Sequence, residues 1–407
     1  MTNQDINLFQ GGKNVIIALQ HLIACFGATT LVPILLGLEI PVALFSAGVG
    51  TLLFHWITRG KVPVFLGSSF AFIPVIGAVI GSTGSIPQAQ GGIIAAGLIY
   101  VLLGLIVQKY GVEKISSVLK PHIVGTIITI IGFTLIPVAI DMSANNSRIA
   151  MLTAVSIFLL MVLPKGFIKT MAIILGVGIG YITSHALEIV DMSAFSNASV
   201  IAVPNFTPPA FSLSAILTIA PVVIAVFMEH LGDITANQTI VGKNFIKDPG
   251  LGKTLMGDGI ATIFAGFIGG PPNTTYSENT GVLAITKNYN PAILRMTAVF
   301  AIALAFLGKL GALLQTIPVF VMGGASLILF GMIAKIGLET LWNDNIFISE
   351  EKVITVILML GIGLNPFSDY LIAGIQLSGV AVAALVGIII SLTSNTIRRR
   401  RRLNENN

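Results

Sequence analysis

The chain has 407 residues, of which 55% are hydrophobic and only 10% charged, whereas about a quarter of the residues in an ordinary soluble protein are charged. This composition excludes a soluble domain and predicts an all-α polytopic membrane protein. The formal charge of +5 does not indicate a nucleic-acid partner, because five of the basic residues form one C-terminal run, Arg398–Arg402.

The single cysteine, Cys25, excludes a disulfide framework and a cysteine-rich metal site. It lies in an apolar run, where we expect it to be a small buried side chain. None of the apolar runs combines a nucleophile with a base or carries a metal-ligand set. We therefore expect neither an enzyme nor a resident metal or cofactor.

Apolar runs between glycine, proline and charge breaks predict fourteen spans. A span needs about 20 residues to cross roughly 30 Å of hydrocarbon, so fourteen spans leave room only for short loops. The spans cover residues 15–37, 41–58, 63–80, 91–109, 119–140, 148–164, 168–188, 214–234, 253–269, 272–286, 292–309, 317–337, 352–367 and 374–397.

The distribution of lysine and arginine predicts that both termini are cytoplasmic. An even number of spans puts the two termini on one side, and the positive-inside rule assigns the arginine run to the cytoplasm. With this orientation, nearly all other basic residues lie at cytoplasmic ends, and Arg148 and Lys309 are the exceptions. The first twelve residues lack the features of a cleaved signal peptide. We expect a multi-pass protein of the cell membrane.

The longest predicted loop, residues 189–213, separates two sets of seven spans. The chain divides into a first repeat (1–188), this outer linker, a second repeat (214–397) and a basic cytoplasmic tail (398–407). Because seven is odd, the halves enter the membrane in opposite directions, as in many secondary transporters. Spans five and twelve share proline and glycine positions, which predict a smooth contact suited to sliding: Pro121, Gly125 and Gly132, and Pro318, Gly324 and Gly331.

Spans three and ten hold equivalent places in the halves, and polar or helix-breaking residues interrupt both. Residues 67–74 read GSSFAFIP and residues 269–279 read GGPPNTTYSEN. Such stretches free backbone groups that hydrocarbon cannot satisfy, so they occur where they line a protein cavity. The pairing predicts a central binding site; two packing kinks are the alternative.

Three carboxylates converge on this predicted site. Glu229 and Asp233 lie one helical turn apart in span eight, and Glu278 lies in the interruption of span ten. Carboxylates in a membrane are costly and usually face a water-filled cavity. The alternative is a structural pairing of these carboxylates with His21 or His230. We expect both histidines to be hydrogen-bond donors, and Asp258 to be a cap or network residue.

The segment from Glu278 to Lys287 carries the most specific motif of the chain. It reads ENTGVLAITK, which fits the signature of the nucleobase-ascorbate transporters, also called the nucleobase:cation symporter-2 family. The chain resembles this family, in particular its bacterial uracil-transporting branch, over nearly its whole length. The other segments that carry the resemblance are Gln20-His21, residues 67–72, residues 273–276 and residues 318–324.

The resemblance implies fourteen spans in two inverted repeats, with short antiparallel strands in spans three and ten. It also implies a core domain of spans 1–4 and 8–11 and a gate domain of spans 5–7 and 12–14. The family further implies a homodimer embedded in membrane lipid and proton-coupled uptake of uracil, with the proton as coupling ion in place of a cofactor.

Residue by residue, the resemblance assigns Glu229 and Glu278 to the pyrimidine, with Phe70 at the ring and Ser277 at a backbone contact. Tyr276 is a further substrate-binding residue. The supporting residues that it implies are Gln20, His21, Ser69, His230 and Asn279.

One position departs from the uracil-transporting branch, which has histidine where this chain has Asp233. Asp233, alone or jointly with Glu229, is the predicted proton carrier, because desolvation and a neighbouring carboxylate both favour its protonated form. The same departure keeps a xanthine, urate or other purine transporter as the alternative. An anion exchanger of the same inverted plan is a more distant alternative, because the predicted site is acidic.

Overall fold

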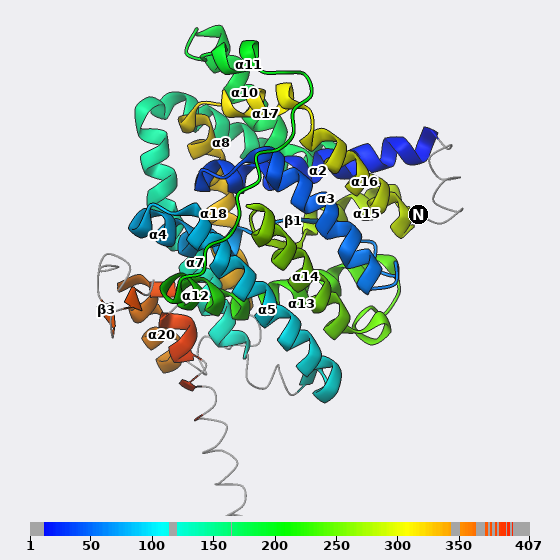
Figure 1. Ribbon diagram of the computed structural model, residues 1–407, viewed down its shortest axis with the longest axis vertical. Helices are drawn as coiled ribbons and strands as arrows, with labels where there is room; N and C mark the ends of the chain where they lie inside the picture. The colour runs from blue at the N-terminus through cyan, green and yellow to red at the C-terminus, as the bar shows by residue number, and fades with distance from the viewer. Residues whose placement is uncertain are drawn as a thin grey trace, which may run out of the picture.

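The computed structural model (Figure 1) describes residues 12–113, 120–163, 165–342 and 351–363, and short pieces between residues 371 and 393. The predicted tail of residues 398–407 and much of the predicted last span lie outside the described residues. What is described is mostly helical, which confirms the predicted fold class at that level.

The first half of the chain contains eight helices and one strand among its described residues. Proline within the first two residues starts α3, α4, α5 and α7, where its missing N–H removes no helical hydrogen bond. In chain order the elements are α2 (Gly12–Leu36), α3 (Ile40–Ile57), β1 (Leu66–Ser68), α4 (Ile73–Thr83), α5 (Ile86–Tyr110), α7 (Pro121–Ser143), α8 (Ser147–Val162), α9 (Phe167–Thr170) and α10 (Ala172–Ala186).

The second half follows a long connection that contains the short helix α11 (Ser193–Asn197). Its described elements are α12 (Leu213–Ile219), α13 (Val223–Val241), α14 (Leu251–Ile268), β2 (Asn273–Thr275), α15 (Ser277–Thr286), α16 (Pro291–Ala305), α17 (Gly308–Gln315), α18 (Val319–Trp342), α20 (Glu351–Gly363), β3 (Leu371–Ile372) and β4 (Ile375–Gln376).

Seven helical stretches of the described chain are long and apolar enough to cross a membrane, which makes this a multi-pass membrane protein. One of them, Pro121–Val162, contains two predicted spans, α7 and α8, joined by a 3₁₀ turn at Ala144–Asn146. The stretches are Gly12–Leu36, Ile40–Ile57, Ile86–Tyr110, Pro121–Val162, Leu213–Val241, Ile246–Ile268 and Val319–Trp342.

The start of the predicted last span is wrong. Helix was predicted from residue 374, but β3 and β4 pair as antiparallel strands with Leu371 opposite Gln376. A short apolar run has no feature that separates a strand from the first turns of a buried helix.

The described helices pack as two groups. In the first, α5 lies along α14, and α3 lies between α14 and α16 with α2 beside them. In the second, α18 lies along α7 and α8, with α10 packed against α8 and α20 packed against α7. Figure 1 shows α3, α14 and α16 on the right, and α8 and α20 on the left. Each group therefore combines helices from both halves of the chain.

Glycine allows the helices of the first group to approach closely. A Cβ on Gly97 of α5 would lie 2.8 Å from the carbonyl oxygen of Gly259 on α14, and one on Gly104 would lie 2.6 Å from that of Gly252. Without a hydrophobic force between helices in lipid, such backbone contact is a main source of association.

The glycines of spans five and twelve lie mainly at close helix contacts within the second group. A Cβ on Gly132 of α7 would lie 2.4 Å from the backbone nitrogen of Ala334 on α18, and one on Gly324 of α18 would lie 2.1 Å from the carbonyl oxygen of Ala150 on α8. These glycines hold the second group together. Gly331 faces open space among the described residues.

The two interrupted segments meet at the centre of the first group, where β1 and β2 pair antiparallel with Gly67 opposite Thr274. Side chains from the surrounding helices complete the hydrogen bonding. The Leu66 amide donates to Thr51 Oγ1 (2.9 Å), and the Asn273 amide donates to Thr262 Oγ1 (3.2 Å). Helix α15 begins directly after β2, and α4 follows β1 after the 3₁₀ turn Phe70–Phe72.

The predicted linker is an extended strap over the first group, running from α11 to α12 (Figure 1). Its backbone forms a bridge between Ile201 and Leu307 and donates from Ala210 to Pro87 O (2.8 Å). Lys309, an exception to the charge rule, donates to the carbonyl oxygens of Phe195 (2.7 Å) and Ser196 (3.1 Å) at α11. A local structural role therefore accounts for its position.

Gly132→Ala should lower the thermal stability of the purified protein, because the new Cβ forces α7 away from α18. Overpacking costs about 1–3 kcal/mol, enough to lower the unfolding midpoint by a few degrees. A thiol-reactive dye would follow unfolding through the buried Cys25. The matched control Gly331→Ala meets nothing within 4 Å and should leave the midpoint unchanged; equal midpoints for both variants would contradict the glycine contact.

Candidate functional site

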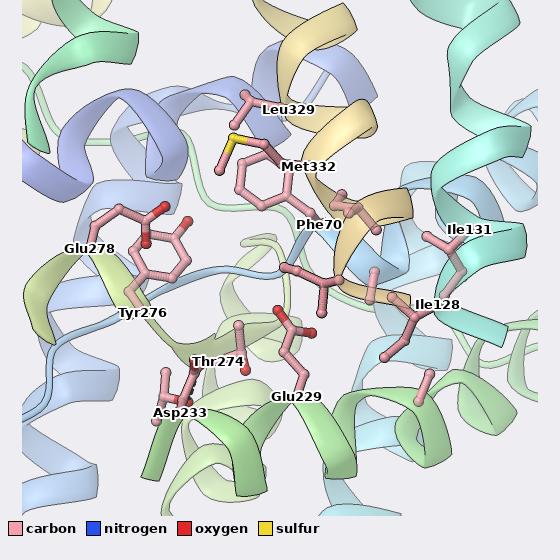
Figure 2. Close-up of a pocket in the computed structure, with 15 residues that line it drawn as sticks. Phe70, Ile128, Ile131, Glu229, Asp233, Thr274, Tyr276, Glu278, Leu329 and Met332 are labelled. Atoms are coloured by element: carbon pink, nitrogen blue, oxygen red, sulfur yellow. Dashed lines mark hydrogen bonds between the residues drawn. The ribbon is translucent and has the colours of Figure 1, made fainter. Parts of the chain in front are cut away.

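A cavity of about 160 Å³ lies between the paired strands and the second helix group (Figure 2). One side carries carboxylates, hydroxyl groups and two aromatic rings, and the other side is aliphatic. Its lining residues are Phe70, Ala71, Ile128, Ile131, Ala225, Glu229, Asp233, Thr274, Thr275, Tyr276, Glu278, Leu329, Met332, Ile333 and Ile336.

Helix α13 carries Glu229 and Asp233 on one face, as their spacing predicted. Both side chains line the cavity and are half-buried. Figure 2 shows the Glu229 carboxylate rising from α13 into the cavity. Thr275 of β2 donates its hydroxyl to Asp233 Oδ2 at 3.0 Å. Asp233 is therefore tied to the strand that crosses the site.

Glu278 enters the cavity from another direction, in the first turn of α15. The strand β2 ends three residues earlier, so the helix starts beside the site. A carboxylate in the first turn is stabilised by the positive end of the helix dipole. Ser277 is the first residue of α15, and its side chain lies outside the described part.

Tyr276 fastens the two strands to each other. Its hydroxyl donates to the carbonyl oxygen of Ser68 at 2.8 Å, and the side chain is 5% exposed. The ring covers Gly67, where a Cβ would lie 2.3 Å from Tyr276 Cε2. Only glycine at position 67 leaves room for the ring at this place.

Phe70 stands opposite the carboxylates at the start of a 3₁₀ turn, Phe70–Phe72, and is half-buried. Leu329 and Met332 of α18 lie beside its ring in Figure 2, and Ile128 and Ile131 of α7 close the right side. This aliphatic wall was not predicted from the sequence, since such residues are indistinguishable from lipid-facing ones by composition. Thr275 was not predicted either, although its position in the span ten interruption could have indicated it.

None of the five predicted supporting residues is among the described lining of the cavity: Gln20, His21, Ser69, His230 and Asn279. His21 is fully buried in α2, and its Nδ1 donates to Asn279 Oδ1 at 2.8 Å, one residue beyond Glu278. This bond connects α2 to the first turn of α15. Ser69 donates its amide to Pro272 O at 2.8 Å and extends the strand pairing.

His230 points away from the cavity into a buried polar group. Its Nδ1 donates to Asp258 Oδ2 at 2.8 Å, and its Nε2 lies 2.8 Å from Thr254 Oγ1. All three side chains are fully buried between α13 and α14. The hydrogen-bonding role predicted for both histidines is confirmed, and Asp258 is the network residue. The alternative pairing of Glu229 and Asp233 with these histidines is not found among the described residues.

The polar side of the cavity can accept hydrogen bonds, and none of the described residues that line it is basic. Among the described residues that line it, Glu229, Asp233 and Glu278 are the only charged ones. A carboxylate accepts hydrogen bonds at two oxygens. The arrangement suits a small planar molecule with N–H donors on one edge and an apolar face, and disfavours an anion.

The chain is similar to known permeases over nearly its whole length. A family model described as "Permease family" matches residues 12–372. The chain is 41% identical over 392 residues to the "Probable uracil permease" of Haemophilus influenzae, covering 93% of this chain and 94% of that one. It is 37% identical over 398 residues to the "Uracil permease" of Bacillus subtilis, covering 92% and 91%.

Among solved structures, the fold is similar to the transmembrane domain of the cyanobacterial bicarbonate transporter BicA. The TM-score is 0.62 at 14% sequence identity, covering 96% of this chain and 98% of that chain. At this identity the likeness concerns the fold alone.

Gly67→Ala should destabilise the protein by about 1–3 kcal/mol, because the new methyl group displaces the Tyr276 ring. In a Tyr276→Ala background the same substitution should cost almost nothing, and the unfolding midpoints of the four proteins measure this coupling. Gly77→Ala is the matched control, since its Cβ would meet only Leu36 Cδ2 at 3.8 Å. An undiminished cost in the Tyr276→Ala background would refute the ring contact.

Proposed function

The chain belongs to the Permease family matched over residues 12–372, and from this membership and the cavity we propose that it carries uracil across the cell membrane. The membership confirms the resemblance to the nucleobase:cation symporter-2 family and makes the protein a transporter and not an enzyme. The observation that carries the choice of substrate is the convergence of Glu229 and Glu278 on a small cavity whose described lining has no basic residue.

A neutral pyrimidine ring matches this cavity chemically. Uracil presents two N–H donors and two carbonyl acceptors around one flat ring, so the carboxylates accept from its N–H groups. Phe70 and the aliphatic wall contact its faces, and backbone amides at the start of α15 donate to its carbonyl groups. The volume of about 160 Å³ lies below the roughly 300–1,000 Å³ of drug-sized pockets, which favours a small ligand such as a single nucleobase.

The proposed topology is fourteen spans in two inverted repeats, with both termini cytoplasmic and a homodimer as the assembly in lipid. The first helix group corresponds to the core domain and the second to the gate domain. We propose that the core domain moves against the gate domain to expose the site to each side in turn. The close glycine contacts within both groups support movement as rigid units.

We further propose a proton as the coupling ion, carried by Asp233 or by Asp233 and Glu229 jointly. Uracil is neutral, so its accumulation requires a coupled ion that moves down its own electrochemical gradient. One charge crossing about 100 mV supplies roughly 2.3 kcal/mol, or on the order of fifty-fold accumulation. The position of Asp233 one turn from Glu229, at the cavity, supports this assignment.

An anion exchanger on the same fold is disfavoured by the same site. The likeness to the bicarbonate transporter extends to the fold, whereas the three carboxylates lining the cavity repel an anion.

Glu278→Gln should weaken uracil binding at least tenfold, because an amide turns a donor toward the ring N–H and a charge-assisted bond of about 1.5–3 kcal/mol is lost. Calorimetry of the purified protein with uracil, xanthine and bicarbonate measures this and tests the substrate class. Glu339→Gln, exposed on α18, is the matched control. Tighter binding of xanthine than of uracil by the parent would replace the pyrimidine assignment with the purine one.

Asp233→Asn should still bind uracil and exchange it across the membrane but should no longer concentrate it. The amide cannot release a proton, so transport loses its coupling while the site keeps its shape. Uptake into proteoliposomes with an imposed pH gradient measures accumulation, and counterflow without a gradient measures exchange. Asp141→Asn, exposed at the end of α7, is the control. Protonophore-sensitive accumulation by Asp233→Asn at the parent level would exclude Asp233 as the carrier.

A further inference from the structure

A second cavity lies at the end of the molecule where α3 stops. The residues after α3 form a tight turn, in which Arg59 and Gly60 both have left-handed backbone conformations (φ 56° and 64°). The Gly60 amide donates to His55 O at 2.6 Å. A left-handed conformation is uncommon for arginine. The turn brings Lys61 out of the line of the helix toward the loop that joins α13 to α14.

Three separate segments contribute to this cavity, which has a volume of about 660 Å³. They are the turn after α3, the loop after α13 and the first residue of α16. The lining residues are Gly60, Lys61, Lys243, Asn244, Phe245, Lys247, Asp248 and Pro291. Arg295 of α16 lies at the rim, since a Cβ on Gly60 would be 3.0 Å from its Nη1.

The described lining is strongly basic, with three lysines against a single carboxylate, that of Asp248. The Lys61 side chain forms an ion pair with the Asp248 carboxylate, with Nζ 2.5 and 2.7 Å from the two oxygens. This ion pair keeps Lys61 at the edge of the cavity.

The side chains of Lys243 and Lys247 are exposed and have no hydrogen bond or ion pair among the described residues. Two ammonium groups at one cavity, with a guanidinium at the rim, attract an anion that has several acceptor oxygens. The positive-inside rule accounts for the side of the membrane on which these residues lie. It does not account for their convergence from two separate segments on a single cavity.

The cavity lies near the membrane surface. Trp56, in the last turn of α3, is 76% exposed, and its carbonyl oxygen accepts from the Arg59 amide at 3.2 Å. Exposed tryptophans of membrane proteins concentrate at the level of the lipid headgroups. A phosphate can reach this position from a lipid headgroup or from the aqueous phase.

The geometry points to a phosphate-binding site in this cavity, formed by Lys243 and Lys247 with Arg295 at the rim. Its ligand is a phosphate group, either the headgroup of an anionic phospholipid or a free phosphate. A bound phosphate would connect α16 to the loop after α13, the helix that carries Glu229 and Asp233. The site is separate from the uracil cavity and does not depend on the function proposed for it.

The test measures the unfolding midpoint of the full-length protein in detergent with phosphatidylglycerol, phosphatidylcholine, inorganic phosphate or chloride at equal ionic strength. Phosphatidylglycerol or phosphate should raise the midpoint of the parent, since a ligand of the folded state stabilises it. Stabilisation by phosphatidylglycerol alone identifies the lipid headgroup, and stabilisation by inorganic phosphate identifies the free anion.

The double variant Lys243→Gln/Lys247→Gln should bind this ligand about 25-fold more weakly, at about fivefold for each basic residue. The matched control is Lys165→Gln/Lys169→Gln, two exposed lysines outside the cavity lining, and it should respond as the parent does. An equal response by both double variants would overturn the proposal. So would stabilisation by chloride as large as that by phosphate or phosphatidylglycerol, or the absence of stabilisation by either.

Discussion

The structure depends on one constraint, that backbone polar groups inside a membrane must be hydrogen-bonded within the protein. The segments around Gly67 and Thr274 are not helical, and each satisfies the other by pairing as β1 and β2. Hydroxyl groups of Thr51 and Thr262, from the neighbouring helices, complete the set. The site exists because this pairing allows two extended segments to cross the centre of a helical protein.

The strand crossing also explains where the carboxylates lie. Glu278 follows β2 by three residues, and Thr275 of β2 holds Asp233 from the opposite side. Behind this layer, His230 and Asp258 form a buried pair between α13 and α14. Removing one member would leave the other charged or unpaired in an apolar environment, which is strongly unfavourable. The pair therefore anchors the helix that presents Glu229.

The two sides of the cavity are lined by different kinds of side chain. The strands at the centre of the first group and the helices α13 and α15 supply the hydroxyl groups and the acidic residues. The second group supplies the aliphatic side chains of α7 and α18, including Ile131 and Met332. Glycine lies inside the groups, where Gly132 meets Ala334 and Gly97 meets Gly259. Small residues bring backbones together within each group, and bulky side chains line the boundary at the cavity.

The sequence by itself determined the membrane class, the positions of most helices and the residues on the acidic side of the site. These features are local: apolar length sets a span, and the four-residue spacing of Glu229 and Asp233 puts both on one helix face. The interruption of span ten indicated Glu278, because a polar stretch within an apolar run is tolerated in a membrane only where it lines a cavity inside the protein.

Only the tertiary structure decided which surfaces meet. The aliphatic wall from α7 and α18, the contact of Tyr276 with Gly67 and the orientation of His230 toward Asp258 all join residues distant in the chain. An isoleucine that faces the cavity and one that faces lipid have the same composition and periodicity, because lipid is as apolar as a protein core. For the same reason the sequence predicted that the glycines of α7 and α18 make close contacts, but it did not predict which helix each glycine contacts.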